Sequence, residues 1–217
     1  MATQQQIQVF FEQNDARQRG QLQMKRMIDV FFSVAVLLCL FPLIVVIALA
    51  IRLDSNGPVL YLSERIGRKG RAFCCMKFRT MVCDADAQRA NLEHLNERND
   101  VLFKISNDPR VTRIGKFLRK YSLDELPQFL NVLCGDMSIV GPRPPIAEEV
   151  MKYDLFHLHR LNVKPGITGL WQVMARQDPS FEKYIELDLA YVEQWTLWMD
   201  LRIMARTVGV VFAGTGR

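Results

Sequence analysis

The chain has 217 residues, 49% of them hydrophobic, and a formal net charge of +5. This length fits one domain with an attached membrane segment, and the apolar content is enough for a sizeable core. The modest positive charge fits an anionic membrane surface or phosphate-bearing ligands. Nucleic acid is not expected as a partner, because no basic block or aromatic-interleaved stripe accompanies the charge.

The cysteines argue against a secreted, disulfide-rich protein. There are five of them, an odd number, and no C-x-x-C pair exists. A reducing, cytosol-facing domain is therefore expected. Zinc bound by Cys74, Cys75 and Cys83 is disfavoured by their spacing, and the pair His157 and His159 lacks a third ligand.

A candidate membrane segment follows a polar start. Residues 1–23 are glutamine-rich and form a polar N-terminal extension, and residues 24–55 are expected to form a membrane helix. The run from Val30 to Ile51 has no charged residue, and as a straight helix it would be roughly 33 Å long, enough for a bilayer core. Pro42 lies near its middle, removes a helix hydrogen bond and predicts a bend.

Basic residues flank this segment on both sides. Cationic flanks favour the cytoplasmic side of a membrane, so two of them predict a re-entrant helix whose ends emerge on one face. An ordinary kinked span is the alternative. Lys25, Arg26 and Asp29 are expected to anchor the start of the helix at the lipid headgroups, although Asp29 could simply pair with a cation. The flanking cations are Lys25, Arg26, Arg52, Arg65 and Arg68.

Residues 56–217 are expected to form the catalytic domain, mainly helical with a short β-hairpin. Asn56-Gly57-Pro58 is a turn signal. Lys77 and Arg79 fall on one face of the second hairpin strand by the period of two. Strands are predicted at Val59–Ser63 and Phe73–Met81 around a turn at Gly67–Gly70. Helices are predicted at 82–99, 112–121, 180–192 and 196–212.

Two of these helices have distinctive faces. Arg113, Lys116 and Lys120 line one side of the helix at 112–121. A solvated face and a phosphate-facing or lipid-facing role both fit that stripe. The last helix is apolar along one side and begins beside two tryptophans, which favours a helix lying in the membrane interface. A core-packed terminal helix stays open.

The stretch at residues 119–128 carries the adjacent acids Asp124 and Glu125 at a helix start. Either Ser122 is the N-cap and Glu125 completes a capping box, or Asp124 is the N-cap and the following proline is better tolerated. Both registers place the acids at the positive end of a helix, which keeps carboxylates ionised and attracts phosphate. An ionised aspartate can attack phosphorus or bind Mg2+. Simple helix capping is the alternative.

A second informative stretch presents Arg143 between Pro142 and Pro144. Both prolines fix their own φ, and Pro144 restricts Arg143 to extended backbone geometry. A rigidly held guanidinium suits bidentate phosphate recognition. A loop arginine tied to a nearby acid is the alternative. The stretch from Lys164 to Trp171 marks a turn with little built-in chemistry.

Many short motifs occur in order from about Met24 to Phe212, and together they resemble the bacterial sugar transferase family of monotopic phosphoglycosyl transferases. One departure is Phe41-Pro42, where many members have Ser-Pro. Longer members carry an N-terminal bundle of spanning helices, and this chain resembles their catalytic part alone. The motifs are Lys25-Arg26-x-x-Asp29, the apolar helix with its central proline, Glu64-Arg65-Ile66-Gly67, Lys77-Phe78-Arg79-Thr80-Met81, Asn107-Asp108-Pro109-Arg110, Ser122-Leu123-Asp124-Glu125-Leu126-Pro127-Gln128, Gly135-Asp136-Met137-Ser138, Gly141-Pro142-Arg143-Pro144 and Pro165-Gly166-Ile167-Thr168-Gly169.

The resemblance implies an α+β, monotopic membrane protein with a re-entrant N-terminal helix held by Lys25, Arg26, Asp29 and Pro42, and with interfacial amphipathic helices. It implies that Asp124 attacks the β-phosphate of a UDP-sugar, expels UMP and forms a covalent phosphosugar intermediate, which a polyprenyl phosphate then attacks.

The resemblance also implies that Glu125 assists and that magnesium is required, with Asp124 as its expected ligand. Arg143 and Arg119 are expected to bind the nucleotide or its phosphates. Further candidates for substrate binding are Lys77, Arg79, Pro142 and Pro144.

The expected reaction transfers hexose-1-phosphate, with glucose or galactose favoured, from a UDP-hexose to undecaprenyl phosphate in exopolysaccharide, capsule or O-antigen assembly. The expected location is the bacterial inner membrane, in contact with its lipids and with the catalytic domain facing the cytosol; a homodimer is possible. One alternative is direct transfer with Glu125 or Asp124 as general base. Others are a membrane-bound scaffold or inactive paralogue and, least favoured, a membrane-tethered nucleic-acid binder.

Overall fold

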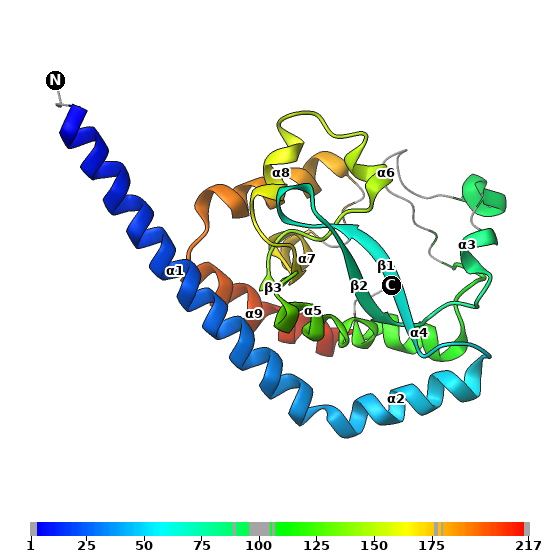
Figure 1. The fold of residues 1–217 in the computed structure, drawn as a ribbon. Coiled ribbons are helices and arrows are strands. Elements are labelled where there is room, and N and C mark those ends of the chain that lie inside the picture. Colours follow the sequence, from blue (N-terminus) through cyan, green and yellow to red (C-terminus); the bar gives the residue numbers. More distant parts are fainter. Residues whose placement is uncertain are drawn as a thin grey trace.

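A computed structural model describes residues 4–88, 90–95, 105, 107–175, 178 and 180–214. This part of the chain is mainly helical and contains two small two-stranded sheets (Figure 1). The expected α+β class with a short β-hairpin is confirmed. The five cysteines are free thiols.

Two long helices, α1 (Gln4–Cys39) and α2 (Phe41–Asp54), form a bent arm along one side of the molecule (Figure 1). The axes of Arg19–Cys39 and of α2 differ by 63°. The break is confined to Leu40, because the amide of Ile44 again donates to the Leu40 carbonyl at 2.8 Å. Pro42 lies in the first turn of α2, where its missing N–H costs little. The expected bend is confirmed, and the expected boundary at residue 23 falls inside α1.

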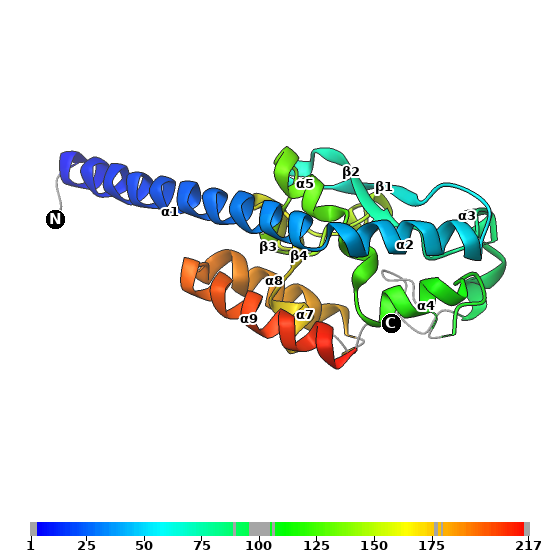
Figure 2. The ribbon, with the colours of Figure 1, turned by 90° about the horizontal axis from the view of Figure 1, so that it is seen from below.

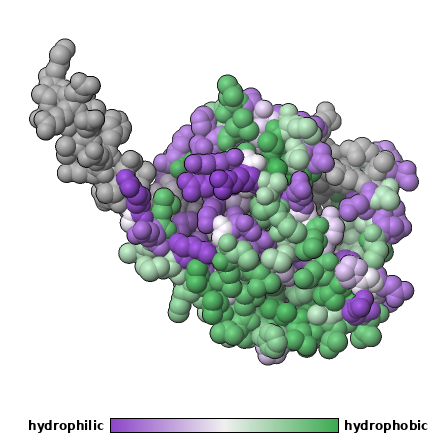
Figure 3. Space-filling model, in the orientation of Figure 1, coloured by the Kyte–Doolittle hydropathy of each residue, from purple (hydrophilic) through white to green (hydrophobic). Residues whose placement is uncertain are grey.

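No single described helix has both the length and the apolar character needed to cross a bilayer. The bent pair has both when its two halves are taken together. The pair exposes large apolar side chains, and Figure 3 shows them as a continuous hydrophobic region on the lower part of the molecule. Among them are Phe31, Leu38, Phe41, Leu49 and Leu53.

The second half of α1 is bonded to the rest of the protein through Lys25, Arg26 and Asp29, hereafter the α1 latch. The ammonium of Lys25 donates to Asp200 at 2.6 Å. Arg26 donates to two carbonyl oxygens near the end of α5 (Gln128–Cys134). A carboxylate oxygen of Asp29 accepts from the amide of Ile139 at 3.0 Å. These contacts turn the three side chains toward the protein, and the expected anchoring at the lipid headgroups stays a prediction.

The hairpin consists of β1 (Leu60–Ile66) and β2 (Ala72–Phe78), paired antiparallel around the 3-10 turn η1 (Arg68–Gly70). The hairpin and its turn are confirmed, although β1 extends three residues beyond the expected end and β2 stops at Phe78. One face of the hairpin carries Arg65 on β1 together with Cys75 and Lys77 on β2. Cys75 and Lys77 lie directly opposite Ser63 and Tyr61, and these two share a face with Arg65 because they precede it by two and four residues.

A second sheet pairs β3 (Ser138–Val140) in parallel with β4 (Gly166–Thr168). The sequence had been interpreted as a turn at β4. The two segments approach so closely that a Cβ on Gly166 would lie 2.1 Å from the amide nitrogen of Gly141. Glycine is therefore required there for steric reasons.

The single helix expected at 82–99 is wrong over the described residues, where two short pieces replace it. These are α3 (Ala85–Gln88) and the 3-10 helix η2 (Ala90–Leu95); residues 89 and 96–99 lie outside the described part. The other three expected helices are confirmed. They are α4 (Arg113–Lys120), α8 (Phe181–Gln194) and α9 (Leu197–Ala213), with the N-caps Thr112, Ser180 and Thr196.

The remaining helical elements are short and connect the larger ones. They are η3 (Leu123–Glu125), α6 (Ala147–Val150), η4 (His157–Asn162) and α7 (Leu170–Met174). Helix α2 buries Ile47 and Ile51 against Phe78, Leu118 and Leu126. Seen from below, α2, α4 and α9 lie on the same side of the molecule (Figure 2), and each exposes large apolar side chains, such as Phe117 and Phe212.

Candidate active site

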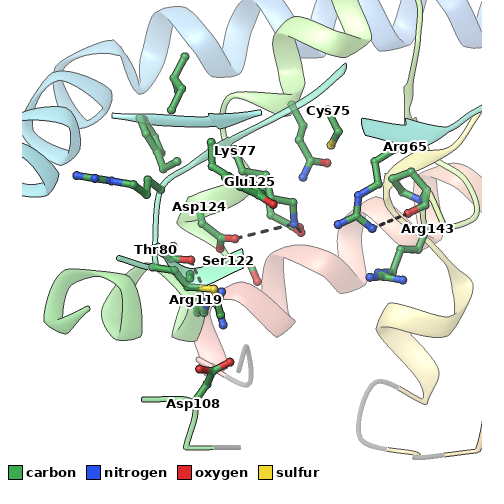
Figure 4. A pocket seen from close by; sticks show the side chains of 18 of the residues that line it. Arg65, Cys75, Lys77, Thr80, Asp108, Arg119, Ser122, Asp124, Glu125 and Arg143 are labelled. Carbon is green, nitrogen blue, oxygen red and sulfur yellow. Dashed lines mark hydrogen bonds and ion pairs between the residues drawn. The ribbon is translucent and has the colours of Figure 1, made fainter. Parts of the chain in front are cut away.

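A cavity of about 550 Å³ is lined by the hairpin, the η3 turn and the loops around β3 and β4. Most of the residues expected to form a site line it. They are Lys77, Arg79, Arg119, Asp124, Glu125, Arg143 and Pro144. Figure 4 shows two groups of side chains: Lys77, Arg119, Asp124 and Glu125 at one end, and Arg65 with Arg143 at the other.

The two acids lie in a 3-10 turn that precedes the helix. Helix α5 starts at Gln128, and Pro127 occupies its N-cap position. Both predicted registers are therefore wrong. Ser122 lies at the start of η3, but its φ of 54° is left-handed, unlike the extended backbone of a capping-box serine. Proline has no N–H to donate, so α-helical hydrogen bonding is interrupted at residue 127 and the regular helix starts after it.

Lys77 distinguishes the two carboxylates. Its ammonium lies 2.6 Å from an oxygen of Glu125 but 4.0 Å from the nearest oxygen of Asp124. Burial raises the pKa of Asp124 to about 6; the positive charge of Lys77 opposes this rise and the negative charge of Glu125 adds to it. Asp124 is therefore mostly ionised at neutral pH, yet its charge is incompletely compensated.

Arg119 approaches Asp124 from α4. Its Nε donates to the hydroxyl of Thr80 at 2.9 Å, which orients the guanidinium next to Asp124 and Asp108 (Figure 4). Burial lowers the pKa of Arg119, and the charges of Asp124 and Asp108 counter that effect. The arginine stays protonated at physiological pH in any such setting. It can therefore neutralise a phosphate bound at Asp124.

Arg143 is both paired and accessible. Its NH1 lies 3.4 Å from a carboxylate oxygen of Glu149, and 35% of its side chain is exposed. The backbone around it is fixed by Arg160, which donates to the carbonyl of Arg143 at 2.9 Å. Arg160 is fully buried and bonded to Asp188, Tyr153 and Tyr184. The guanidinium of Arg143 is thus presented to the cavity by a rigid support.

Arg79 and the two prolines contribute differently from what was expected. Because β2 ends at Phe78, the face shared with Lys77 does not continue to Arg79. The Arg79 guanidinium donates to the carbonyls of Ser55 and Asn56 at 2.8 and 2.5 Å, and so secures the end of α2. Pro142 and Pro144 are buried, and their carbonyls accept from the amide of Gly166 and from Arg65.

Sequence reasoning missed Arg65 and Arg160 as residues of the site. Arg65 had been assigned to the membrane flank, whereas its side chain reaches the cavity (Figure 4). The signal that could have revealed it is the hairpin register, which places Arg65 on the same face as Lys77. Arg160 carries no local signal, because its partners lie on other elements.

The carboxylates of the cavity can bind a divalent cation only if water and substrate phosphates supply the remaining oxygen ligands. The described residues contain no group of three or more His, Cys, Asp or Glu side chains arranged to bind a metal. Mg2+ commonly takes one or two protein carboxylates and completes its octahedron with water and substrate phosphates. Asp124 and Glu125 fit that requirement.

Comparison with known proteins gives a consistent result. The family model described as "Bacterial sugar transferase" matches residues 20–214. The chain is 44% identical over 193 residues to "Galactosyl transferase CpsE" of Streptococcus agalactiae serotype III, covering 88% of this chain and 43% of that protein. It is 41% identical over 214 residues to "Undecaprenyl-phosphate galactose phosphotransferase" of Salmonella typhimurium, covering 94% and 44%.

A shorter relative matches over nearly its whole length. "Exopolysaccharide production protein ExoY" of Rhizobium meliloti is 40% identical over 196 residues, covering 88% of this chain and 87% of that protein. The chain otherwise spans less than half the length of the first two relatives.

Proposed function

The chain belongs to the bacterial sugar transferase family, and on that premise we propose that it transfers a hexose-1-phosphate from a UDP-sugar to undecaprenyl phosphate and releases UMP. Relatives named for this reaction use galactose or glucose, for example the "UDP-glucose:undecaprenyl-phosphate glucose-1-phosphate transferase" of Escherichia coli at 39% identity. Glucose and galactose are therefore the favoured hexoses, and exopolysaccharide, capsule or O-antigen assembly is the favoured pathway.

The observation that supports this function best is that the ammonium of Lys77 lies much closer to Glu125 than to Asp124. Glu125 is neutralised by an ammonium at 2.6 Å, whereas Asp124 lies 4.0 Å away and is only 13% exposed. A desolvated carboxylate is a stronger nucleophile than a solvated or tightly paired one. Asp124 therefore has the reactivity that a covalent route requires, and Glu125 is suited to assist.

In the proposed first step a carboxylate oxygen of Asp124 attacks the β-phosphorus of the UDP-sugar. A new acyl-phosphate P–O bond forms, the bond from the β-phosphorus to the bridging oxygen breaks, and UMP leaves with that oxygen. In the second step an oxygen of undecaprenyl phosphate attacks the same phosphorus, and the carboxylate of Asp124 is released. Lys77, Arg119 and Arg143 compensate the charge on the phosphate oxygens.

Asp124 and Glu125 are the proposed protein ligands of Mg2+. When bound, the ion would neutralise phosphate oxygens that otherwise repel the attacking carboxylate. The raised pKa of Asp124 supports the proposal, because a cation beside this carboxylate would relieve its uncompensated charge.

The bent pair α1–α2 is proposed to enter and leave the bacterial inner membrane on the cytosolic face. The bend of 63° and the exposed apolar side chains of both halves support this topology. The exposed apolar side of α9, with Trp198 and Phe212, supports a position in the membrane interface. Cysteines introduced before residue 30 and after residue 56 should be labelled from the same side in intact cells. Labelling of the first from outside and the second only from inside would exclude a re-entrant helix.

The experiment that tests the function is UMP release from a panel of UDP-sugars in the presence of undecaprenyl phosphate and Mg2+. Release should depend on one hexose and on the lipid acceptor for multiple turnovers. Absence of release with every sugar would refute the proposal.

The covalent route has a separate test by intact-protein mass spectrometry after incubation with UDP-sugar and Mg2+ but no lipid. Asp124→Asn should abolish the phosphosugar adduct and turnover. Glu125→Gln should slow turnover by about 10²- to 10⁴-fold, and Glu148→Gln, on an exposed acid of α6, serves as the control. An adduct on Glu125, or an undiminished adduct in Asp124→Asn, would overturn the assignment of Asp124 as the nucleophile. Turnover of the wild type without any adduct would favour the rival route in which an acid acts as a general base.

A further inference from the structure

Arg65 occupies a position that the proposed chemistry has not used. It lies on β1, on the hairpin face that also carries Lys77, and lines the same cavity as Asp124. Figure 4 shows its guanidinium close to that of Arg143, at the end of the cavity away from Asp124 and Arg119. Two guanidinium groups from separate parts of the chain, β1 and the loop after β3, therefore lie at the same end of the cavity.

The contacts of Arg65 leave its charge unneutralised. Its Nε donates to the hydroxyl of Ser63 at 3.1 Å and its NH1 to the carbonyl of Pro144 at 3.3 Å. Neither acceptor carries a charge, and no described carboxylate forms an ion pair with Arg65. Both contacts instead orient the guanidinium, because they hold it between its own strand and the loop of Arg143.

One carboxylate serves both arginines. Glu149 lies 3.4 Å from Arg143 and is 5% exposed. Burial lowers the pKa of Arg65, and the nearby charge of Arg143 lowers it further, while Glu149 opposes both effects. The two half-buried guanidinium groups therefore share one carboxylate and retain an excess of positive charge. A partly desolvated excess charge is costly, so this arrangement is expected to be completed by an anion.

A phosphate group matches this arrangement in geometry and charge. Each guanidinium offers a planar fork of donors, which binds two oxygens of one phosphate. The exposed part of the Arg143 side chain, 35%, shows that a ligand can reach the pair from the cavity.

We infer that Arg65 and Arg143 form a phosphate clamp that binds a second phosphate group, separate from the one that Asp124 attacks. The inference rests on the proposed function only for the source of that group. In the first step it would be the phosphate that departs with UMP, and in the second it would be the phosphate of the lipid acceptor. Arg65 is thereby a substrate-binding residue and not a membrane-flanking cation.

The test compares UMP with uridine, which differ by the phosphate alone. Affinities are measured by titration calorimetry on the full chain in detergent, with a chelator present to exclude metal effects. Arg65→Met should weaken UMP binding on the order of 10- to 100-fold, the effect of losing a charge-assisted hydrogen bond, and leave uridine binding unchanged. Arg71→Met is the control, since Arg71 is exposed on the same hairpin.

A second measurement separates the two sources of phosphate. If the clamp binds the lipid phosphate, Arg65→Met keeps normal UMP affinity and normal adduct formation, but undecaprenyl phosphate discharges the adduct more slowly. Arg65→Lys keeps the charge without the fork and should lie between wild type and Arg65→Met. It also provides the readout if Arg65→Met does not fold.

Two outcomes would overturn the inference. In the first, Arg65→Met reduces UMP and uridine binding equally, which indicates a structural role. In the second, UMP affinity, adduct formation and discharge all match Arg71→Met. Failure of the proposed function is distinguishable, because a chain that releases no UMP from any UDP-sugar can still show, or lack, an Arg65-dependent preference for UMP over uridine.

Discussion

Replacing the proposed nucleophile should make the protein more stable. Burial raises the pKa of Asp124 from 3.8 to about 6, so the folded state favours the protonated form. A difference of about 2 pKa units corresponds to about 3 kcal/mol, which the folded protein loses as the pH rises through this range. Asn resembles the neutral acid in shape. Asp124→Asn should therefore gain up to about 3 kcal/mol above pH 6 and almost nothing near pH 4.

The measurement is thermal unfolding of the detergent-purified chain at pH 4 and pH 7.5, with a chelator present. For a chain of this size about 3 kcal/mol corresponds to a rise in Tm of roughly 6–12 °C. Glu125→Gln is the contrasting variant and should lower Tm at pH 7.5, since it removes the carboxylate 2.6 Å from Lys77. An unchanged or lower Tm for Asp124→Asn at pH 7.5, or an equal gain at pH 4, would refute the argument that Asp124 is held in a costly charged state.

Three further predictions concern the site and its support. The kcat/KM of the wild type should fall about tenfold per pH unit once Asp124 is protonated, because the protonated acid cannot attack phosphorus; Mg2+ bound to Asp124 as proposed should move this fall below about pH 6, and a profile that stays flat down to about pH 4 would contradict the role. Arg143→Lys keeps the charge but loses the planar fork, so activity should fall strongly while Tm changes little, and full activity or unfolding would exclude the assigned role. Asp188→Asn leaves the buried Arg160 without its counter-charge and should cost about 3–5 kcal/mol in denaturant unfolding, whereas Glu186→Gln, in an exposed ion pair, should cost at most about 1 kcal/mol.

The elements that sequence reasoning predicted well are those with local signals at their ends. Helices α4, α8 and α9 each follow a Thr or Ser whose side chain accepts from a backbone amide three residues on. The hairpin is similarly predicted by its glycine-containing turn. In each case the information lies within a few residues of the element, so no knowledge of the tertiary structure was needed.

The errors occur where distant segments decide the structure. The parallel pairing of β3 with β4 joins residues 138–140 to 166–168, and neither three-residue strand has a recognisable period of its own. At residues 119–128 the helix-start signals competed with the missing amide of Pro127, and the chain resolves the conflict with a 3-10 turn before α5.

In the candidate site, too, local motifs were predicted well and residues placed by the tertiary structure were missed. Motifs identified Asp124, Glu125, Lys77, Arg119 and Arg143, and all five line one cavity. The error at Arg65 arose because a basic residue close in sequence to the apolar segment was interpreted as a membrane-flanking cation. Arg65 follows the apolar run closely in sequence, but it lies on β1, whose register turns its side chain into the cavity.

The α1 latch has a consequence for how a lipid-borne acceptor of the proposed kind would meet the protein. Three side chains bond α1 to α5, β3 and α9, and one of these bonds joins Lys25 to the carboxylate of Asp200 on α9. Sliding of α1 along the rest of the protein would break several of these bonds at once. If the arm enters the bilayer as proposed, it holds Asp124 at a fixed height relative to the bilayer surface. A lipid-borne acceptor would then need only to diffuse in two dimensions at that height, and bilayers of different thickness should change how deeply the whole protein sits without altering the distance from its arm to its cavity.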